Sequence, residues 1–175
     1  MDERLIPRIA AGDKQALEAL YSQTKSAVYG FALSIVRSAH TAEDVMQETY
    51  IKVYTSAPSY DPQGKPMAWI FTIARNLALM KLREKSATEV SLDPGRDRVK
   101  EEFTPEQALD RMVLKSAMLI LGEDERQIII LHDVAGMKHR EISGILQMPL
   151  PTVLSKYRRA LSKLKKHLKE GMRDD

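Results

Sequence analysis

The chain of 175 residues contains no cysteine. Disulfides, thiolate metal sites and cysteine nucleophiles are therefore excluded, and the composition suits a reducing compartment. Apolar runs are short, such as Ile128–Leu131, whereas a membrane-spanning helix needs about 20 apolar residues. We expect no signal peptide, because the N-terminus is charged and soon reaches Pro7. These absences predict a cytoplasmic protein without membrane insertion.

Residue patterns that carry catalysis are also missing. The chain has only eight glycines and no phosphate-cradling loop, and it has no nucleophile elbow. The acid pair Glu43-Asp44 is more simply a helix start than an acid–base couple. Four histidines are scattered without metal-ligand spacing: His40, His132, His139 and His167. We therefore expect no catalytic residue, no metal and no cofactor.

The net charge of +3 is an average over three unequal segments. Residues 1–85 carry 11 basic and 9 acidic side chains, a net charge of +2. Residues 86–110 carry 3 basic and 7 acidic side chains, a net charge of −4. Residues 111–175 carry 13 basic and 8 acidic side chains, a net charge of +5. Within residues 151–170 seven basic side chains accompany one acid. This one-sided block indicates a negatively charged partner for the C-terminal end.

Apolar spacing predicts helices and no strand. Apolar residues recur every three or four positions from Leu17 to Ile35, which indicates one long helix with an apolar stripe. A second helix is expected from about Ala42, with Thr41 as its N-cap, to about Ser56. A turn-rich loop over residues 58–66 precedes a third helix over about residues 67–85.

Residues 86–104 lose the helical period and contain Asp93-Pro94-Gly95, which predicts a flexible acidic linker. A helix is expected to start at Thr104–Gln107. The next helix is expected to begin with the acids after Gly122 and to break at Val134–Met137. The chain is therefore expected to be all-α, with two small helical domains over residues 1–85 and 105–175.

The C-terminal end has the pattern of a helix-turn-helix. Helices are expected over roughly His139–Gln147 and Pro151–Lys169, with a tight turn between them. In this layout the second helix enters the DNA major groove. A basic helix with one apolar face is most often simply solvated, but the tight turn and the one-sided charge favour DNA binding here. The side chains expected at the duplex are Arg140, Thr152, Ser155, Lys156, Arg158, Arg159 and Lys163.

Aromatic side chains occur among positive charges in the first half. Trp69, with Tyr60 nearby, lies close in sequence to Lys65 and Arg75. This mixture suits single-stranded nucleic acid, whose bases stack on aromatic rings. A lone tryptophan is more often a core residue, so the signal is weak by itself.

Three stretches resemble bacterial sigma factors, in the correct order along nearly the whole chain. Ala42–Tyr54 resembles the polymerase-binding helix of that family, and Ala68–Asn76 resembles the helix after its promoter-melting loop. Asp124–Ile129, followed by the helix-turn-helix with Pro151–Val153, resembles its C-terminal domain. The short linker and the missing central domain resemble the extracytoplasmic-function (ECF) branch.

The resemblance implies a factor that binds core RNA polymerase, reads the −35 and −10 promoter elements and helps to open the −10 DNA. The helix-turn-helix would read the −35 element, and the linker would follow the RNA exit path, with the β subunit as a further contact. The residues implied at the β′ clamp helices are Asp44, Gln47, Glu48 and Lys52. Those implied at the −10 element are Ser59, Tyr60, Asp61, Lys65, Trp69, Arg75, Asn76, Lys81 and Arg83. An anti-sigma factor is a possible further partner.

Several residues depart from the family pattern. Met80 stands where the family usually has Asp, Lys138 where it has an N-cap Ser, and Gln147 where it has a turn Gly. Pro149 and Pro151 replace small or polar residues, and Leu154 and Lys156 replace a common Lys and Arg. Pro is tolerated at a helix start, so the fold is unaffected, but the promoter sequence cannot be carried over.

Two other functions fit parts of the sequence. One alternative is a stand-alone helix-turn-helix regulator that binds duplex DNA as a dimer. It would give no role to the polar face of the helix expected from about Ala42 to about Ser56. A helical adaptor without a role on DNA is the other alternative. Transcription with purified core polymerase distinguishes all three.

Overall fold

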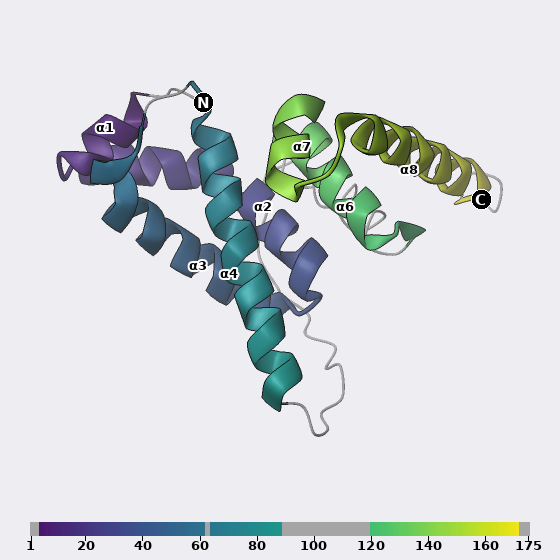
Figure 1. Ribbon diagram of the computed structural model, residues 1–175, viewed down its shortest axis with the longest axis horizontal. Coiled ribbons are helices and arrows are strands. Elements are labelled where there is room, and N and C mark those ends of the chain that lie inside the picture. The colour runs from purple at the N-terminus through teal and green to yellow at the C-terminus, as the bar shows by residue number, and fades with distance from the viewer. Residues whose placement is uncertain (1–3, 62–63, 89–119, 172–175) are drawn as a thin grey trace. The chain divides into compact units, whose positions relative to one another are not determined.

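The computed structural model describes residues 4–61, 64–88 and 120–171 (Figure 1). Every regular element in these ranges is a helix, as predicted. The chain divides into two compact units, Met1–Lys100 and Glu101–Asp175. Most of the expected linker, and the helix expected to start at Thr104, lie outside the described residues.

Three long helices build the first unit: α2 (Lys14–Val36), α3 (Ala39–Ser56) and α4 (Pro66–Thr88), each of which packs against the other two (Figure 1). The short η1 (Ala57–Ser59) follows α3. The rings of Phe31 and Phe71 are fully buried and meet edge to face, with centroids 5.3 Å apart. Burial of such a side chain contributes about 1.5–3 kcal/mol, so this contact joins α2 to α4 firmly.

A buried polar contact joins α2 to α3. The hydroxyl oxygens of Thr24 and Tyr50 lie 2.7 Å apart, and Thr24 also donates to the carbonyl of Leu20. Burial raises the pKa of Tyr50 well above its usual range. The predicted stripe of α2 is confirmed, because Leu20, Val28, Phe31 and Ile35 are all buried.

A short helix that the sequence pattern did not predict precedes this bundle. Helix α1 (Leu5–Ala10) contains Pro7, which is tolerated because it lies in the first turn. Its Arg8 donates to Asp13 at 2.9 Å, while the other carboxylate oxygen of Asp13 accepts from the backbone of Gln15 and Ala16. The hydrogen bond from Arg8 lowers the pKa of Asp13, so this N-cap keeps its charge in acid.

Helix α3 begins three residues before the predicted start. The expected N-cap Thr41 is wrong, because the hydroxyl of Ser38 accepts the backbone N–H of Thr41 at 3.3 Å and caps the helix. The Thr41 hydroxyl donates to the Ser38 hydroxyl at 3.0 Å and so belongs to the first turn.

The described part of the second unit contains α6 (Glu123–Ile129), the π turn η2 (Ile130–Val134), α7 (His139–Leu146) and α8 (Leu150–Gly171). Ile129 and Ala160 are buried together and join α6 to α8. The predicted break after Val134 is confirmed: the N–H of Met137 returns to the carbonyl of Leu131 at 2.9 Å, and Gly136 has a φ of 70°. A left-handed backbone of this kind favours glycine.

Gln147 ends α7 in the left-handed region, with a φ of 53° and a ψ of 44°. A side chain with a Cβ is strained there, which explains why a glycine suits this turn. We expect Gln147→Gly to raise the free energy of unfolding by about 0.5–1 kcal/mol, measured by urea denaturation. Gln147→Ala keeps the Cβ and should bring no such gain. Equal stability of the two variants would contradict this account.

Candidate functional site

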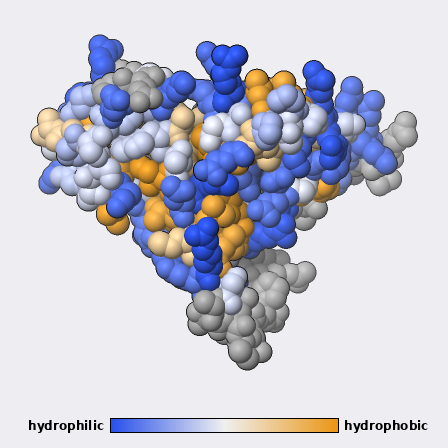
Figure 2. Space-filling model, viewed as in Figure 1, coloured by the Kyte–Doolittle hydropathy of each residue, from blue (hydrophilic) through white to orange (hydrophobic). Residues whose placement is uncertain are grey.

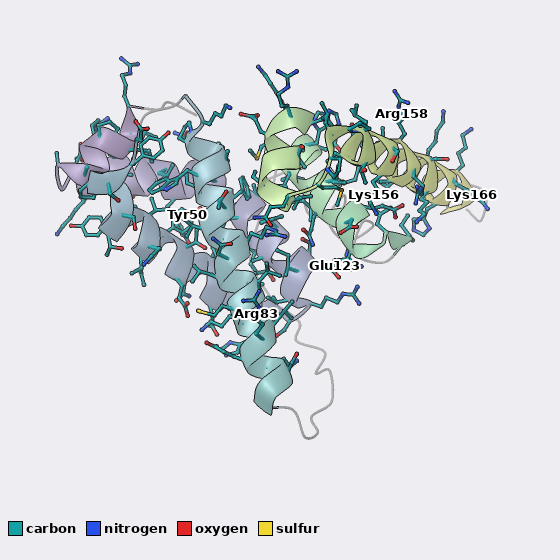
Figure 3. The ribbon with its side chains drawn as sticks, in the orientation of Figure 1. Tyr50, Arg83, Glu123, Lys156, Arg158 and Lys166 are labelled. Carbon is teal, nitrogen blue, oxygen red and sulfur yellow. The ribbon has the colours of Figure 1, made fainter. Side chains whose placement is uncertain are left out.

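Helix α8 has one apolar face and one basic face (Figure 3). Val153 and Ala160, two turns apart, are fully buried, so Ser155 and Ser162 point away from the unit. Hydrophilic residues predominate over α8 at the right of the surface view (Figure 2). The exposed polar side chains of this helix include Ser155, Arg158, Arg159, Ser162, Lys163, Lys165, Lys166 and Lys169.

Two lysines expected at the duplex form ion pairs within the unit. The Lys156 ammonium lies 2.9 Å from an oxygen of Asp124, and the Lys163 ammonium lies 2.6 Å from Glu125. Both acids belong to the first turn of α6. Arg140 on α7 is exposed, and Thr152 on α8 is half-buried. Of the seven expected residues, Lys156 and Lys163 are thus paired within the unit, Thr152 is half-buried, and the other four are exposed.

Side-chain hydrogen bonds fix both ends of α7, and one of them spans the turn to α8. Lys138 has no capping oxygen, but its backbone N–H donates to the carboxylate of Glu141 at 2.8 Å. The hydroxyl of Ser143 donates to the carbonyl of Met148 at 2.6 Å, across the turn. Glu141 thus supplies one half of a capping box, while its own backbone N–H donates to the carbonyl of Lys138 at 2.8 Å in place of a Ser hydroxyl, and the predicted helix-turn-helix is confirmed.

Helix α3 presents the polar face that its spacing predicts. Val45, Thr49 and Val53 are fully buried, whereas Gln47 and Lys52 are exposed. Asp44, Met46 and Glu48 are half-buried. The four residues implied at the polymerase are therefore all reachable from solvent.

Two apolar side chains on this polar face were missed by the sequence analysis. Ile51 is 63% exposed and Tyr54 is 45% exposed. Helical spacing was the available signal, since Ile51 follows Asp44 by two turns and Gln47 by one. A polar rim around exposed apolar groups is the usual composition of a protein-binding surface.

One ion pair joins residues that the resemblance assigns to different partners. The Lys81 ammonium on α4 lies 2.7 Å from the carboxylate of Glu48 on α3. The hydrogen bond to Glu48 raises the pKa of Lys81. Lys81 continues the stripe of buried Ala74 and Ala78, which is why it points towards α3.

The remaining residues implied at the −10 element lie on the loop and on the other side of α4. Asn76 and Arg83 are exposed, and Arg75 is half-buried. Ser59, Asp61 and Lys65 are exposed around the undescribed residues 62–63. The rings of Tyr60 and Trp69 lie 4.8 Å apart, and both are half-buried, so Trp69 is neither a full core residue nor an open platform.

Two histidines that are seven residues apart in sequence come together in the second unit. The rings of His132 and His139 lie 4.1 Å apart, and both contact the ring of Tyr157. The carbonyl of Met137 lies 2.7 Å from Nδ1 of His132, and Tyr157 donates to Asp133 at 3.1 Å. The cluster ties η2, α7 and α8 together.

Neither a metal site nor a membrane span is found in the part of the chain that the structure describes. No group of three or more His, Asp or Glu side chains there is arranged to hold a metal ion. No helix among the same residues is long and apolar enough to cross a bilayer.

A basic helix-turn-helix in one unit and a separate helical unit in the same chain define the class: a DNA-binding protein of transcription. Residues 20–88 match the family Sigma-70 region 2, and residues 111–164 match Sigma-70, region 4. The ECF RNA polymerase sigma factor SigK of Mycobacterium sp. (strain KMS) is 32% identical, over 92% of this chain and 87% of its own. The RNA polymerase sigma-H factor of Pseudomonas aeruginosa is 26% identical, over 99% of this chain and 96% of its own. The chain belongs to the ECF sigma factors, which direct RNA polymerase to promoters.

Solved structures support the same fold. The sigma factor RpoE of Bartonella quintana, in complex with the anti-sigma factor NepR, aligns with a TM-score of 0.65 at 22% identity, over 87% of this chain and 96% of its own. CnrH, in complex with the cytosolic domain of CnrY, aligns with a TM-score of 0.64 at 21% identity, over 97% of both chains.

The histidine cluster predicts a pH dependence of stability. Burial and the neighbouring His132 lower the pKa of His139, although Asp133 opposes this. The unfolded chain, with a His pKa of about 6.5, then binds more protons than the folded one, so stability falls as the pH drops below about 6.5. We expect urea denaturation to show a lower free energy of unfolding at pH 5.5 than at pH 7.5.

The variant His139→Phe should show a smaller loss between these two pH values, because it keeps the ring contacts without the titration. His167→Gln changes an exposed histidine and should keep the full loss. An unchanged pH dependence in His139→Phe would exclude the cluster as its source.

Proposed function

We propose that the exposed side of α3 docks on core polymerase, that α4 and the preceding loop hold the opened −10 strand, and that the outward side of α8 reads the −35 duplex. The observation that carries this proposal is the placement of two polar surfaces of different chemistry in two separate units. The surface on α3 surrounds exposed apolar groups, and the surface on α8 is basic and rich in hydroxyls.

The α3 surface suits a protein partner. Ile51 and Tyr54 supply apolar contact area, and Gln47 and Lys52 supply an exposed polar rim. Asp44 and Glu48 add acceptors for a basic partner surface. The β′ clamp helices are the proposed partner, as the resemblance implies.

The α8 surface suits duplex DNA. Arg158 and Arg159 are exposed on consecutive positions, and each guanidinium matches the acceptor edge of guanine or a phosphate. Ser155 and Thr152 lie in the first turns of the helix, which are the part of a recognition helix that approaches base edges. Arg140 on α7 is in a position to contact the backbone.

The −10 surface suits a single strand. Asn76 and Arg83 are exposed on one side of α4, and the Tyr60–Trp69 pair offers ring faces at the foot of the loop. Ser59, Asp61 and Lys65 add polar groups for an extruded base, and Arg75 adds a charge. Melting itself would then follow from capture of the strand rather than from catalysis.

We also propose that the protein has no enzymatic activity, acts in the cytoplasm with RNA polymerase and uses the acidic linker near the β subunit. An anti-sigma factor is a proposed regulator, because the matched structures of RpoE and CnrH hold NepR and CnrY. Run-off transcription with purified core polymerase, with and without the full chain, tests the central function. Absence of any promoter-dependent transcript on a genomic template library would refute it.

Truncation of the apolar pair tests the polymerase surface. We expect Ile51→Ala with Tyr54→Ala to weaken core binding about 10-fold or more, because exposed apolar anchors dominate such interfaces. Affinity for core polymerase is measured by fluorescence anisotropy of the labelled chain. Thr55→Ala, at an exposed position of the same helix, is the matched control and should bind normally.

Both variants should keep the affinity of the full chain for duplex DNA. Equal loss of polymerase and DNA binding would indicate misfolding. Normal core binding by the doubly truncated chain would place the docking surface elsewhere.

A further inference from the structure

The first turn of α6 holds one flank of α8 at two points. Lys156 and Lys163 are seven residues apart, so they lie on the same flank, two turns from each other. Their ammonium groups reach consecutive acids, Asp124 at 2.9 Å and Glu125 at 2.6 Å. Two bonds about 10 Å apart along the helix axis resist rotation of α8 more than one bond does.

Glu125 is built into this contact. Its side chain is only 7% exposed, and the oxygen that accepts from Lys163 also accepts the backbone N–H of Gly122 at 3.0 Å. Burial alone would raise the pKa of Glu125, but the hydrogen bonds from Lys163 and Gly122 outweigh it, and the pKa is lowered. A buried carboxylate left without its cation is strongly unfavourable, so the Lys163 charge is committed to Glu125.

The outward basic side chains of α8 are in a different situation. Lys165 is exposed and forms no ion pair or hydrogen bond with any residue that the structure describes. It lies far around the helix from Lys163, on the side of Arg158. Lysines that look equivalent in the sequence therefore have different tasks.

We infer that Asp124 and Glu125 are positioning residues for promoter recognition, which set the rotation of α8 through Lys156 and Lys163, and that these two lysines do not contact DNA. The inference rests on the proposed reading of duplex DNA by α8. Base contacts tolerate rotations of only about 10–20°, so fixing the helix about its axis fixes which side chains reach the groove. Removing an ion pair should therefore cost specific binding more than non-specific binding.

The two roles of Lys163 predict opposite results for Glu125→Gln. The DNA probes are a 30-bp duplex selected from a random pool with wild-type holoenzyme and a scrambled duplex of the same length. In the positioning role, loss of the Glu125 charge lowers the affinity of the full chain for the selected duplex by about 3- to 10-fold and changes that for the scrambled duplex less than about 2-fold. If Lys163 contacted DNA, removal of the competing acid would instead raise affinity for both duplexes, and the inference would fail.

The salt dependence of binding separates Lys163 from its control Lys165. Lys163→Met should weaken specific binding and leave the slope of log K against log salt unchanged. Lys165→Met should weaken binding to both duplexes and reduce the slope by about 1, because one phosphate contact is lost. A reduced slope for Lys163→Met would overturn the positioning role.

A charge exchange distinguishes loss of the ion pair from loss of folding. Lys163→Glu alone places two acids together and should abolish specific binding. The double variant Glu125→Lys with Lys163→Glu restores an ion pair but not the acceptor for the Gly122 N–H, so it should recover part of the specific affinity, with circular dichroism reporting normal helix content. A double variant that folds but binds no better than Lys163→Glu would contradict the inference. Failure of the wild-type holoenzyme to enrich any duplex would refute the proposed −35 reading itself.

Discussion

Each helix that carries a proposed contact has to bury one side, and this requirement decides which of its polar groups reach a partner. In α8 the buried positions Val153 and Ala160 turn Ser155 and Arg158 outward. In α3 the buried positions Val45, Thr49 and Val53 leave Gln47 and Ile51 in solvent. The apolar stripe thus positions the proposed contact surface, although its own residues are buried.

Charge in both units is divided between internal pairing and outward display. Lys81, Lys156 and Lys163 each meet an acid of another helix within 3 Å, and each of them borders a buried stripe. A lysine at the border of a stripe is close enough to a neighbouring helix to find a carboxylate, whereas a lysine opposite the stripe is not. The count of basic residues therefore overstates the positive charge available to nucleic acid. The position of each lysine around its helix shows whether its charge is paired within the protein or displayed outward.

Local pattern predicted the long helices and their buried sides, because both depend on spacing within about ten residues, but it did not predict the six-residue helix α1. It placed the N-cap of α3 at Thr41 rather than Ser38, because Asp44, three residues after Thr41, has the spacing of a capping-box partner. The partners of Lys156, Lys163 and His132 could not be predicted. Those contacts join different helices, and their pairing depends on the packing angle of α8 on α6, which periodicity does not encode.

The departures from the family pattern show how local chemistry replaces a missing residue. Without a hydroxyl at position 138, the N-terminus of α7 is capped from inside the helix by Glu141, and Ser143 closes the turn on Met148. Gln147 has its left-handed backbone inside the turn that the Ser143–Met148 hydrogen bond spans. That hydrogen bond holds the turn without the glycine of the family pattern. In the proposed reading of the −35 duplex, outward residues such as Ser155 and Arg158 could therefore change while the buried stripe, the turn and the ion pairs keep α8 in place.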